Sequence, residues 1–190
     1  MQAALALIRG AERPIVIAGG RLHGEGLADL QRFAESFNLP VATPQRRFHT
    51  FDSKHKNAGG RLPNRANKAL LDQLQTSDLV LVLGERMLPS MTQNFTFPKA
   101  PIADQPFIHV WPDAEEVGRA YSPTLGIAAD PRLFLQAMLE AGPGDIPAAR
   151  QGWVEKLNGL HRENMTWRGK SSNDGLVFGN VIAAIDKHMT

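Results

Sequence analysis

The stretch PIVIAGGRLHGEG, residues 14–26, is rich in glycine, and in it an apolar run leads into a turn and then into a helical pattern. Turns of this kind can bind phosphate, because their backbone N–H groups approach an anion closely. Gly19 and Gly24 fit a G-x-x-x-x-G frame, but Glu25 stands where a P-loop needs Lys to neutralise the terminal phosphates. The dinucleotide fingerprint G-x-G-x-x-G fits in no register. Two interpretations stay open: the turn meets an anion, or Gly19 and Gly20 only let the chain leave the strand sharply.

Histidine and aspartate at H-x-x-D-x-x-H spacing form the second candidate for chemistry. His49, Asp52 and His55 could in principle present three metal ligands. Basic side chains within residues 46–56 disfavour a cation there, so we expect Asp52 to order the loop or to pair with a neighbouring base. His109 lies in an apolar run and is expected to be a hydrogen-bonded core histidine. The sequence has neither a G-x-S-x-G nor an H-E-x-x-H motif, so its motifs reveal no catalytic machinery.

Composition excludes several classes of protein. The net charge of +2 is too small to indicate a nucleic-acid partner. The absence of cysteine removes disulfides, thiolate nucleophiles and Cys-zinc sites, and it is compatible with a reducing compartment. No apolar run reaches the ~18 residues that a membrane helix needs, and the N-terminus is interpreted as an amphipathic helix rather than a signal peptide. We therefore expect a cytoplasmic protein that binds no membrane.

Short apolar runs predict the strands that must position any site. They are residues 14–18, 40–43, 78–83, 107–111 and 125–129. Near-continuous apolar character is typical of parallel strands covered on both faces, and helical patterns separate the runs. The chain is therefore predicted to form an α/β, Rossmann-like, doubly wound parallel sheet of five to six strands with helices on both faces.

Helical patterns occupy residues 26–38, 64–78 and 130–139, with Asn64 and Asp130 as candidate N-caps. Pro and Gly then mark residues 141–150 as a linker. One amphipathic helix, residues 153–167, and a second linker, residues 168–175, are predicted to follow. The predicted organisation is a nucleotide-binding-like domain over 1–141, a linker with one helix over 142–175, and the start of a truncated further domain over 176–190.

The loops after the strands gather at one edge of a parallel sheet, where such folds bind ligands. Two of them, residues 43–64 and 84–106, run for some twenty residues each. Loops of about that length are usually functional or form interfaces. Any site is therefore expected at this edge.

Several segments in sequence order resemble the central domain of thiamine-diphosphate-dependent enzymes of the acetolactate synthase, pyruvate oxidase and benzoylformate decarboxylase type. The resemblance covers residues 1–141, and its most specific parts are DLVLVLGERM, residues 78–87, and HVWPDAEEVGRAYSP, residues 109–123. The tail DGLVFGNVIAAIDKHM, residues 174–189, is similar to the linker exit and first helix of the family's cofactor-binding C-terminal domain.

The resemblance implies an excised part of a three-domain parent. The parent's N-terminal domain carries a glutamate that activates the thiazolium ring, and its C-terminal domain carries a G-D-G…N motif for magnesium and the diphosphate. Neither is found here, since Ile146 stands where GPGDI would need its second glycine. The resemblance therefore implies a non-catalytic scaffold without a cofactor of its own, joined to the two other domains in a dimeric or tetrameric parent that uses thiamine diphosphate and magnesium.

Some members of the family bind FAD or ADP in this domain, with glycines near the pyrophosphate, an arginine on phosphate or ring, and acids on ribose. The matching cofactor-binding candidates are Gly19, Gly20, Thr43, Gly59, Gly60, Gly84, Arg86, Asp113 and Asp130. FAD-binding members usually carry an acid two positions before Asp113, where this chain has Trp111. The resemblance therefore favours an unliganded scaffold over an FAD site. The alternative is a free-standing module that binds FAD, ADP or NAD.

Overall fold

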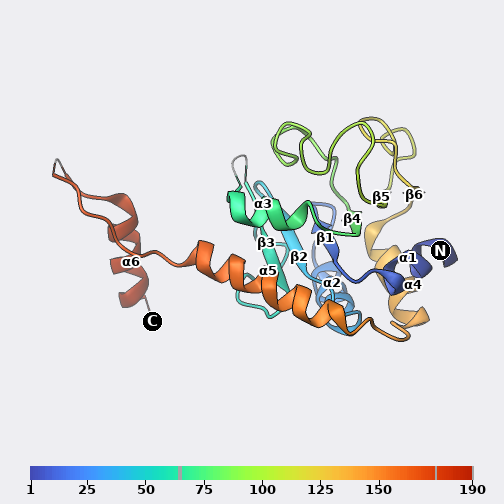
Figure 1. The fold of residues 1–190 in the computed structure, drawn as a ribbon, viewed down its shortest axis with the longest axis horizontal. Helices are drawn as coiled ribbons and strands as arrows, with labels where there is room; N and C mark the ends of the chain where they lie inside the picture. Colours follow the sequence, from blue (N-terminus) through green and yellow to red (C-terminus); the bar gives the residue numbers. More distant parts are fainter. Residues whose placement is uncertain (64–65, 174, 190) are drawn as a thin grey trace.

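A single parallel sheet organises the chain in the computed structural model, which describes residues 1–63, 66–173 and 175–189. Its strands lie in the order β3-β2-β1-β4-β5-β6, and every pair is parallel (Figure 1). The strands are β1 (Pro14–Ala18), β2 (Val41–Pro44), β3 (Ala58–Leu62), β4 (Leu79–Leu83), β5 (Phe107–Trp111) and β6 (Leu125–Ala128). The predicted Rossmann-like, doubly wound fold is confirmed.

Alternate residues of the central strands point into two separate cores. Val16 and Leu81 belong to one apolar cluster, whereas Ile17 and Val82 belong to the other. Every residue of β1, β4 and β5 is buried, because helices or loops cover both faces of these strands. This is why they appear in the sequence as continuous apolar runs rather than alternating ones.

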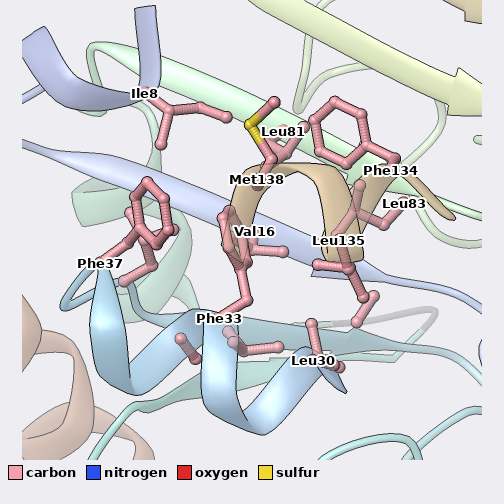
Figure 2. Packing of buried hydrophobic residues seen from close by; sticks show 14 of the residues in the cluster. Ile8, Val16, Leu30, Phe33, Phe37, Leu81, Leu83, Phe134, Leu135 and Met138 are labelled. Atoms are coloured by element: carbon pink, nitrogen blue, oxygen red, sulfur yellow. The ribbon is translucent and has the colours of Figure 1, made fainter. Parts of the chain in front are cut away.

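The first core lies under α1 (Gln2–Gly10), α2 (Glu25–Ser36) and α4 (Pro131–Ala141). Figure 2 shows their apolar side chains meeting over the strands, among them Ile8, Phe33, Phe134 and Met138. The predicted start of α4 is confirmed: the Asp130 carboxylate accepts the Arg132 amide at 2.7 Å, and Pro131 occupies the first turn.

The second core lies under α3 (Lys68–Leu74), α5 (Ala149–Met165) and the segment 84–106. Asn67 caps α3 by accepting the Ala69 amide at 2.9 Å, and the predicted cap Asn64 lies outside the described residues. Met87 and Phe97 fill this core from the long segment, so the segment covers the sheet.

Helix α5 begins inside the predicted linker 141–150 and packs along β3 (Figure 1). The side chain of Trp153 is buried, and its Nε1 donates to the Pro14 carbonyl at 2.7 Å. Arg150 is fully buried and forms no ion pair among the described residues, although the charge of Asp78 acts on it from a longer distance. Its guanidinium donates to main-chain carbonyls where α1 and α2 end, namely those of Ile8, Arg9, Ala11 and Phe37. We call this set the Arg150 cluster.

Strand β3 was not predicted and lies within the predicted loop 43–64. Its sequence, AGGRL, lacks the apolar run that marks the other strands because two of its five residues are glycines. Gly60 has φ +142°, and a Cβ there would lie 2.6 Å from Leu70 of α3. The close packing of α3 on the sheet edge therefore requires a glycine at position 60. This glycine interrupts the apolar run from which the strand could have been predicted.

Helix α6 (Phe178–His188) lies apart from the rest of the chain, and none of its residues is buried (Figure 1). A hydrogen bond of 2.9 Å from Trp167 Nε1 to Asn180 Oδ1 joins it to the preceding segment. Within the described parts of the chain, no helix combines the length and apolar character needed to span a membrane.

Candidate functional site

The carboxyl ends of β1 and β4 lie side by side at the point where the sheet order reverses. Ala18 pairs with Leu83 in the parallel register of these strands. From β1 the chain continues toward β2, whereas from β4 it continues toward β5 on the other side. The two connections diverge and leave a crevice between them, which is where open α/β sheets bind their ligands.

A groove of about 440 Å³ occupies this crevice. It is lined by Gly20, Arg21, Arg47, Gly84, Glu85, Arg86, Leu88, Met91 and Trp111. A second hollow of about 380 Å³ shares Arg47, Leu88 and Met91 with it and extends to Arg46. The site is therefore basic, with an apolar patch on one wall.

Gly19 and Gly20 each have neighbouring protein atoms close to where a side chain would begin. A Cβ on Gly19 would lie 2.3 Å from the carbonyl oxygen of Gly84, which is main chain and cannot swing aside. A Cβ on Gly20 would lie 2.1 Å from Nε of Arg47, whose side chain lies across the turn. Gly19 is therefore required by the protein's own packing, whereas a side chain at position 20 would only have to displace the flexible end of Arg47.

The amides of this turn already have partners. Three of them donate to carbonyls of the same domain: Gly19 to Leu83 at 2.8 Å, Arg21 to Gly84 at 3.2 Å and Leu22 to Gly19 at 3.3 Å. The Gly20 amide lies near the Glu85 carboxylate and favours its charged form. An external phosphate at this turn would therefore meet the Glu85 carboxylate beside the Gly20 amide.

Glu85 is a buried acid, 6% exposed, at the first positions after β4. Its Oε1 accepts the amide of Arg86 at 3.0 Å. Burial raises the pKa of Glu85, against the opposing effects of the Arg86 amide, the Arg47 charge and the Gly20 amide. An ionisable group with this environment on a groove wall is a functional-site candidate.

Trp111 forms the far wall with two guanidinium groups over its ring. The Cζ atoms of Arg21 and Arg86 lie 5.1 and 5.3 Å from the ring centroid. These are cation–π contacts, and the ring itself is only 6% exposed. Nε of Arg86 also lies 3.8 Å from the Glu116 carboxylate. Little of the indole face is left for a ligand ring to stack on.

Four of the nine sequence-predicted residues come together here: Gly19, Gly20, Gly84 and Arg86. Thr43 and Gly60 line a separate cavity of about 10 Å³ instead, which has room for about one water molecule. Gly59 packs against Pro40, 2.9 Å from where its Cβ would be. The ligand role of each of these residues stays a prediction.

The two predicted ribose acids act as caps outside the groove lining. Asp113 accepts the Glu115 amide at 2.9 Å, and Asp130 caps α4. Sequence reasoning did not identify Glu85 as a site residue. Its position between Gly84 and Arg86, directly after a buried strand, was the available signal, but its burial depends on Gly20 from a distant segment.

The histidines and Asp52 have local partners. His55 Nε2 lies 2.9 Å from Glu35 Oε1, and Asp52 accepts the Lys54 amide at 2.8 Å, so Asp52 orders its loop as expected. His109 Nε2 lies 2.8 Å from the Glu85 carbonyl, which confirms it as a hydrogen-bonded core residue, and burial lowers its pKa. In the described ranges no three His, Cys, Asp or Glu side chains gather as metal ligands.

Comparison with known proteins identifies the family. The family model described as "Thiamine pyrophosphate enzyme, central domain" matches residues 1–138. The chain is 27% identical to the sulfoacetaldehyde acetyltransferase of Alcaligenes xylosoxydans xylosoxydans, covering 86% of this chain and 30% of that protein. It is 29% identical to the acetolactate synthase large subunit of Corynebacterium glutamicum, covering 84% and 26%. It is 26% identical to the glyoxylate carboligase of Escherichia coli O157:H7, covering 81% of this chain and 26% of that protein.

The chain thus spans less than a third of the length of these relatives. The matched residues include all six strands and the crevice between β1 and β4. The family match and the observed strand order agree with the resemblance seen in the sequence. This chain therefore belongs to the family of thiamine pyrophosphate enzyme central domains.

Proposed function

We propose that this chain is the non-catalytic central domain of a thiamine-diphosphate-dependent 2-oxo acid decarboxylase or acetolactate synthase-like enzyme, a lyase or transferase, and acts there as a scaffold. One observation carries the proposal: the buried Glu85 carboxylate, an anion of the protein itself, lines the groove beside the glycine turn and accepts the Arg86 amide at 3.0 Å. The groove therefore already carries a negative charge near the position where a dinucleotide would place its pyrophosphate.

Among the described residues, neither thiamine diphosphate nor magnesium finds a fitting set of groups. Magnesium prefers carboxylate and carbonyl oxygens, and this part of the chain gathers no cluster of His, Cys, Asp or Glu side chains that could hold a metal ion. In the glycine turn the amides of Gly19, Arg21 and Leu22 already donate to carbonyls, and the Glu85 carboxylate lies near the Gly20 amide. We therefore derive no step of the parent's reaction from this domain.

The proposed partners are the N-terminal and C-terminal domains of the parent, in a cytoplasmic dimer or tetramer. Exposed apolar side chains on and before α6 support this part of the proposal, since groups of exposed apolar side chains are typical of surfaces that contact another protein surface. They are Leu176, Phe178, Ile182 and Ile185. They belong to the segment that resembles the first helix of the cofactor-binding domain.

Isothermal titration of the purified chain with thiamine diphosphate and Mg²⁺ tests the scaffold role. We expect no heat of binding at micromolar ligand, while cooperative thermal unfolding of the same sample shows that the chain is folded. Binding with micromolar affinity would overturn the proposal, because a domain without a diphosphate site could not supply it.

A second function, a module that binds FAD, ADP or NAD, is supported by the three arginines that line the groove. Guanidinium groups bind phosphate strongly and in bidentate fashion. Such a ligand binds only the folded state and should raise the melting temperature. The absence of any shift at millimolar FAD, ADP and NAD would eliminate this alternative.

A further inference from the structure

The groove holds more positive than negative charge. Arg21, Arg47 and Arg86 face it, and Glu85 is the only carboxylate among its lining residues. Within the described residues, neither Arg21 nor Arg47 forms an ion pair with an acid, whereas Arg86 lies 3.8 Å from Glu116. Guanidinium groups around a concave surface attract anions, so the charges suit an external dianion.

The Glu85 carboxylate nevertheless competes with an external anion for backbone amides of the groove. The Arg86 amide donates to this carboxylate at 3.0 Å, and the nearby Gly20 amide favours its charged form, as backbone N–H groups do around a bound anion. Glu85 thus occupies the position of a ligand oxygen. An incoming dianion would meet the arginines favourably and the ionised carboxylate unfavourably at the same place.

Charged and titratable groups lie around Glu85 on the neighbouring elements. The charges of Arg47, from the loop after β2, and of Arg86, from the same segment as Glu85, act on its carboxyl. Arg21, from the turn after β1, lines the same groove. From β5, His109 contacts the Glu85 main-chain carbonyl, 2.8 Å from its Nε2.

Glu116, from the turn after β5, pairs with Arg86 and with Arg119, so its charge is already balanced. His109 contacts Glu85 only through the main chain. Among these groups, the Glu85 carboxyl is the one whose protonation removes the negative charge that opposes an incoming anion. Protonation also weakens its hold on the Gly20 and Arg86 amides.

We propose that Glu85 is a built-in anion that closes the groove, and that the groove binds a phosphate- or sulfate-like dianion only together with a proton taken up on the Glu85 carboxyl. The one bond change is a proton transfer: an acid of the buffer or solvent gives up its proton, and an O–H bond forms on the Glu85 carboxyl. The Gly20 and Arg86 amides then turn to the ligand. This inference is independent of the scaffold role, because a scaffold can carry an anion site or lack one.

Isothermal titration with sodium sulfate tests the proposal, with sodium chloride at equal ionic strength as the reference. Sulfate keeps its double charge between about pH 5 and about pH 8, so any pH dependence belongs to the protein. We expect the association constant to rise as pH falls, by up to about tenfold per pH unit for one coupled proton. Titrations in two buffers of different protonation enthalpy should show the uptake of that proton.

The Glu85→Gln variant tests whether the pH dependence of sulfate binding comes from Glu85 or from another titratable group. We expect this variant to bind sulfate without pH dependence and at least as tightly as the wild-type protein does at the lowest pH. Glu115→Gln removes an exposed carboxylate outside the groove lining and should keep the wild-type pH dependence. Arg47→Ala should weaken sulfate binding by about tenfold or more in either background.

Three results would overturn the inference: no sulfate binding to Glu85→Gln, binding that keeps its pH dependence in that variant, or wild-type binding without proton uptake. The last measurement needs no variant, so it decides the matter even if Glu85→Gln does not fold. None of these results bears on thiamine diphosphate binding, so the scaffold proposal is tested separately.

Discussion

Two buried charged side chains lie in different parts of this domain. Backbone carbonyl oxygens surround one of them, and backbone N–H groups lie beside the other. Arg150 is a cation surrounded by carbonyl oxygens where α1 and α2 end. Glu85 is an anion that accepts the Arg86 amide and lies near the Gly20 amide. Both follow the rule that a buried charge must be hydrogen-bonded to be tolerated.

The difference between them lies in access. Arg150 is 0% exposed and lines none of the described cavities, so nothing can replace it. Glu85 forms part of the wall of a groove that also carries three guanidinium groups. The comparison indicates that a buried charge is purely structural where it is enclosed and is exchangeable where a cavity reaches it.

Removal of the enclosed charge should have the largest effect. Arg150→Ala removes the guanidinium donor from three buried carbonyls and one part-buried carbonyl and opens a cavity, so we expect a loss of about 3–5 kcal/mol in the free energy of unfolding. Urea denaturation measures it. Lys156→Ala, an exposed change on the same helix, should stay within about 0.5 kcal/mol. A small effect of Arg150→Ala would mean that α5 is not part of the folded core.

The glycine turn offers the next contrast. Gly19→Ala places a methyl against a main-chain carbonyl and should cost about 1–3 kcal/mol, because the backbone must shift. Gly20→Ala meets only the flexible end of Arg47, so it should cost less than about 1 kcal/mol. Thermal unfolding of the two variants under one condition gives the comparison. Equal losses would contradict the packing described for the turn.

The groove charge should appear in the pH dependence of stability. Because burial raises the pKa of Glu85 in the folded state, its favourable contribution is complete at low pH and is lost as pH rises through that pKa. One such group changes stability by at most about 1.4 kcal/mol per pH unit. Urea denaturation across pH should therefore show Glu85→Gln gaining on the wild-type protein as pH rises. A difference that is constant with pH would show that Glu85 does not titrate in this range.

The cap residues should give the smallest effects. Asp130→Ala should cost about 1 kcal/mol because it removes the cap of α4. Asp113→Ala, which removes a single exposed turn contact, should cost less than about 0.5 kcal/mol. If either acid bound ribose as the resemblance implies, its variant would also lose any rise in melting temperature that FAD or ADP produces in the wild-type protein. If neither variant loses that rise, the two acids act only through the local hydrogen bonds described above.

The sheet could be predicted because burial on both faces makes β1, β4 and β5 continuous apolar runs. Strand β3 could not, because the packing of α3 demands Gly60 there and leaves no apolar run. The start of α4 followed from Asp130 and Pro131, which act locally. Local signals and continuous burial were thus sufficient for most of the fold.

The candidate site was predictable only in position. The carboxyl ends of the strands indicated the crevice, and Gly19, Gly20, Gly84 and Arg86 do meet there. The partner of the Gly20 amide could not be inferred, because Glu85 reaches it from a segment some sixty residues away that only the sheet brings near. A charged residue after a strand is usually solvated, and burial of this one depends on the tertiary structure.

Helix α5 has a mechanical consequence. Its 17 residues make a rod about 25 Å long, anchored near its first turn by the Arg150 cluster and leading at its far end toward α6 (Figure 1). A tensile force applied at α6 would load this rod from its C-terminal end, first where His161 Nε2 lies 2.9 Å from the Ser53 carbonyl and where Asn158 donates to the carbonyls of His55 and Ala58 at 3.0 Å. The Arg150 cluster, at the opposite end of the rod, would be the last of these attachments to bear the load.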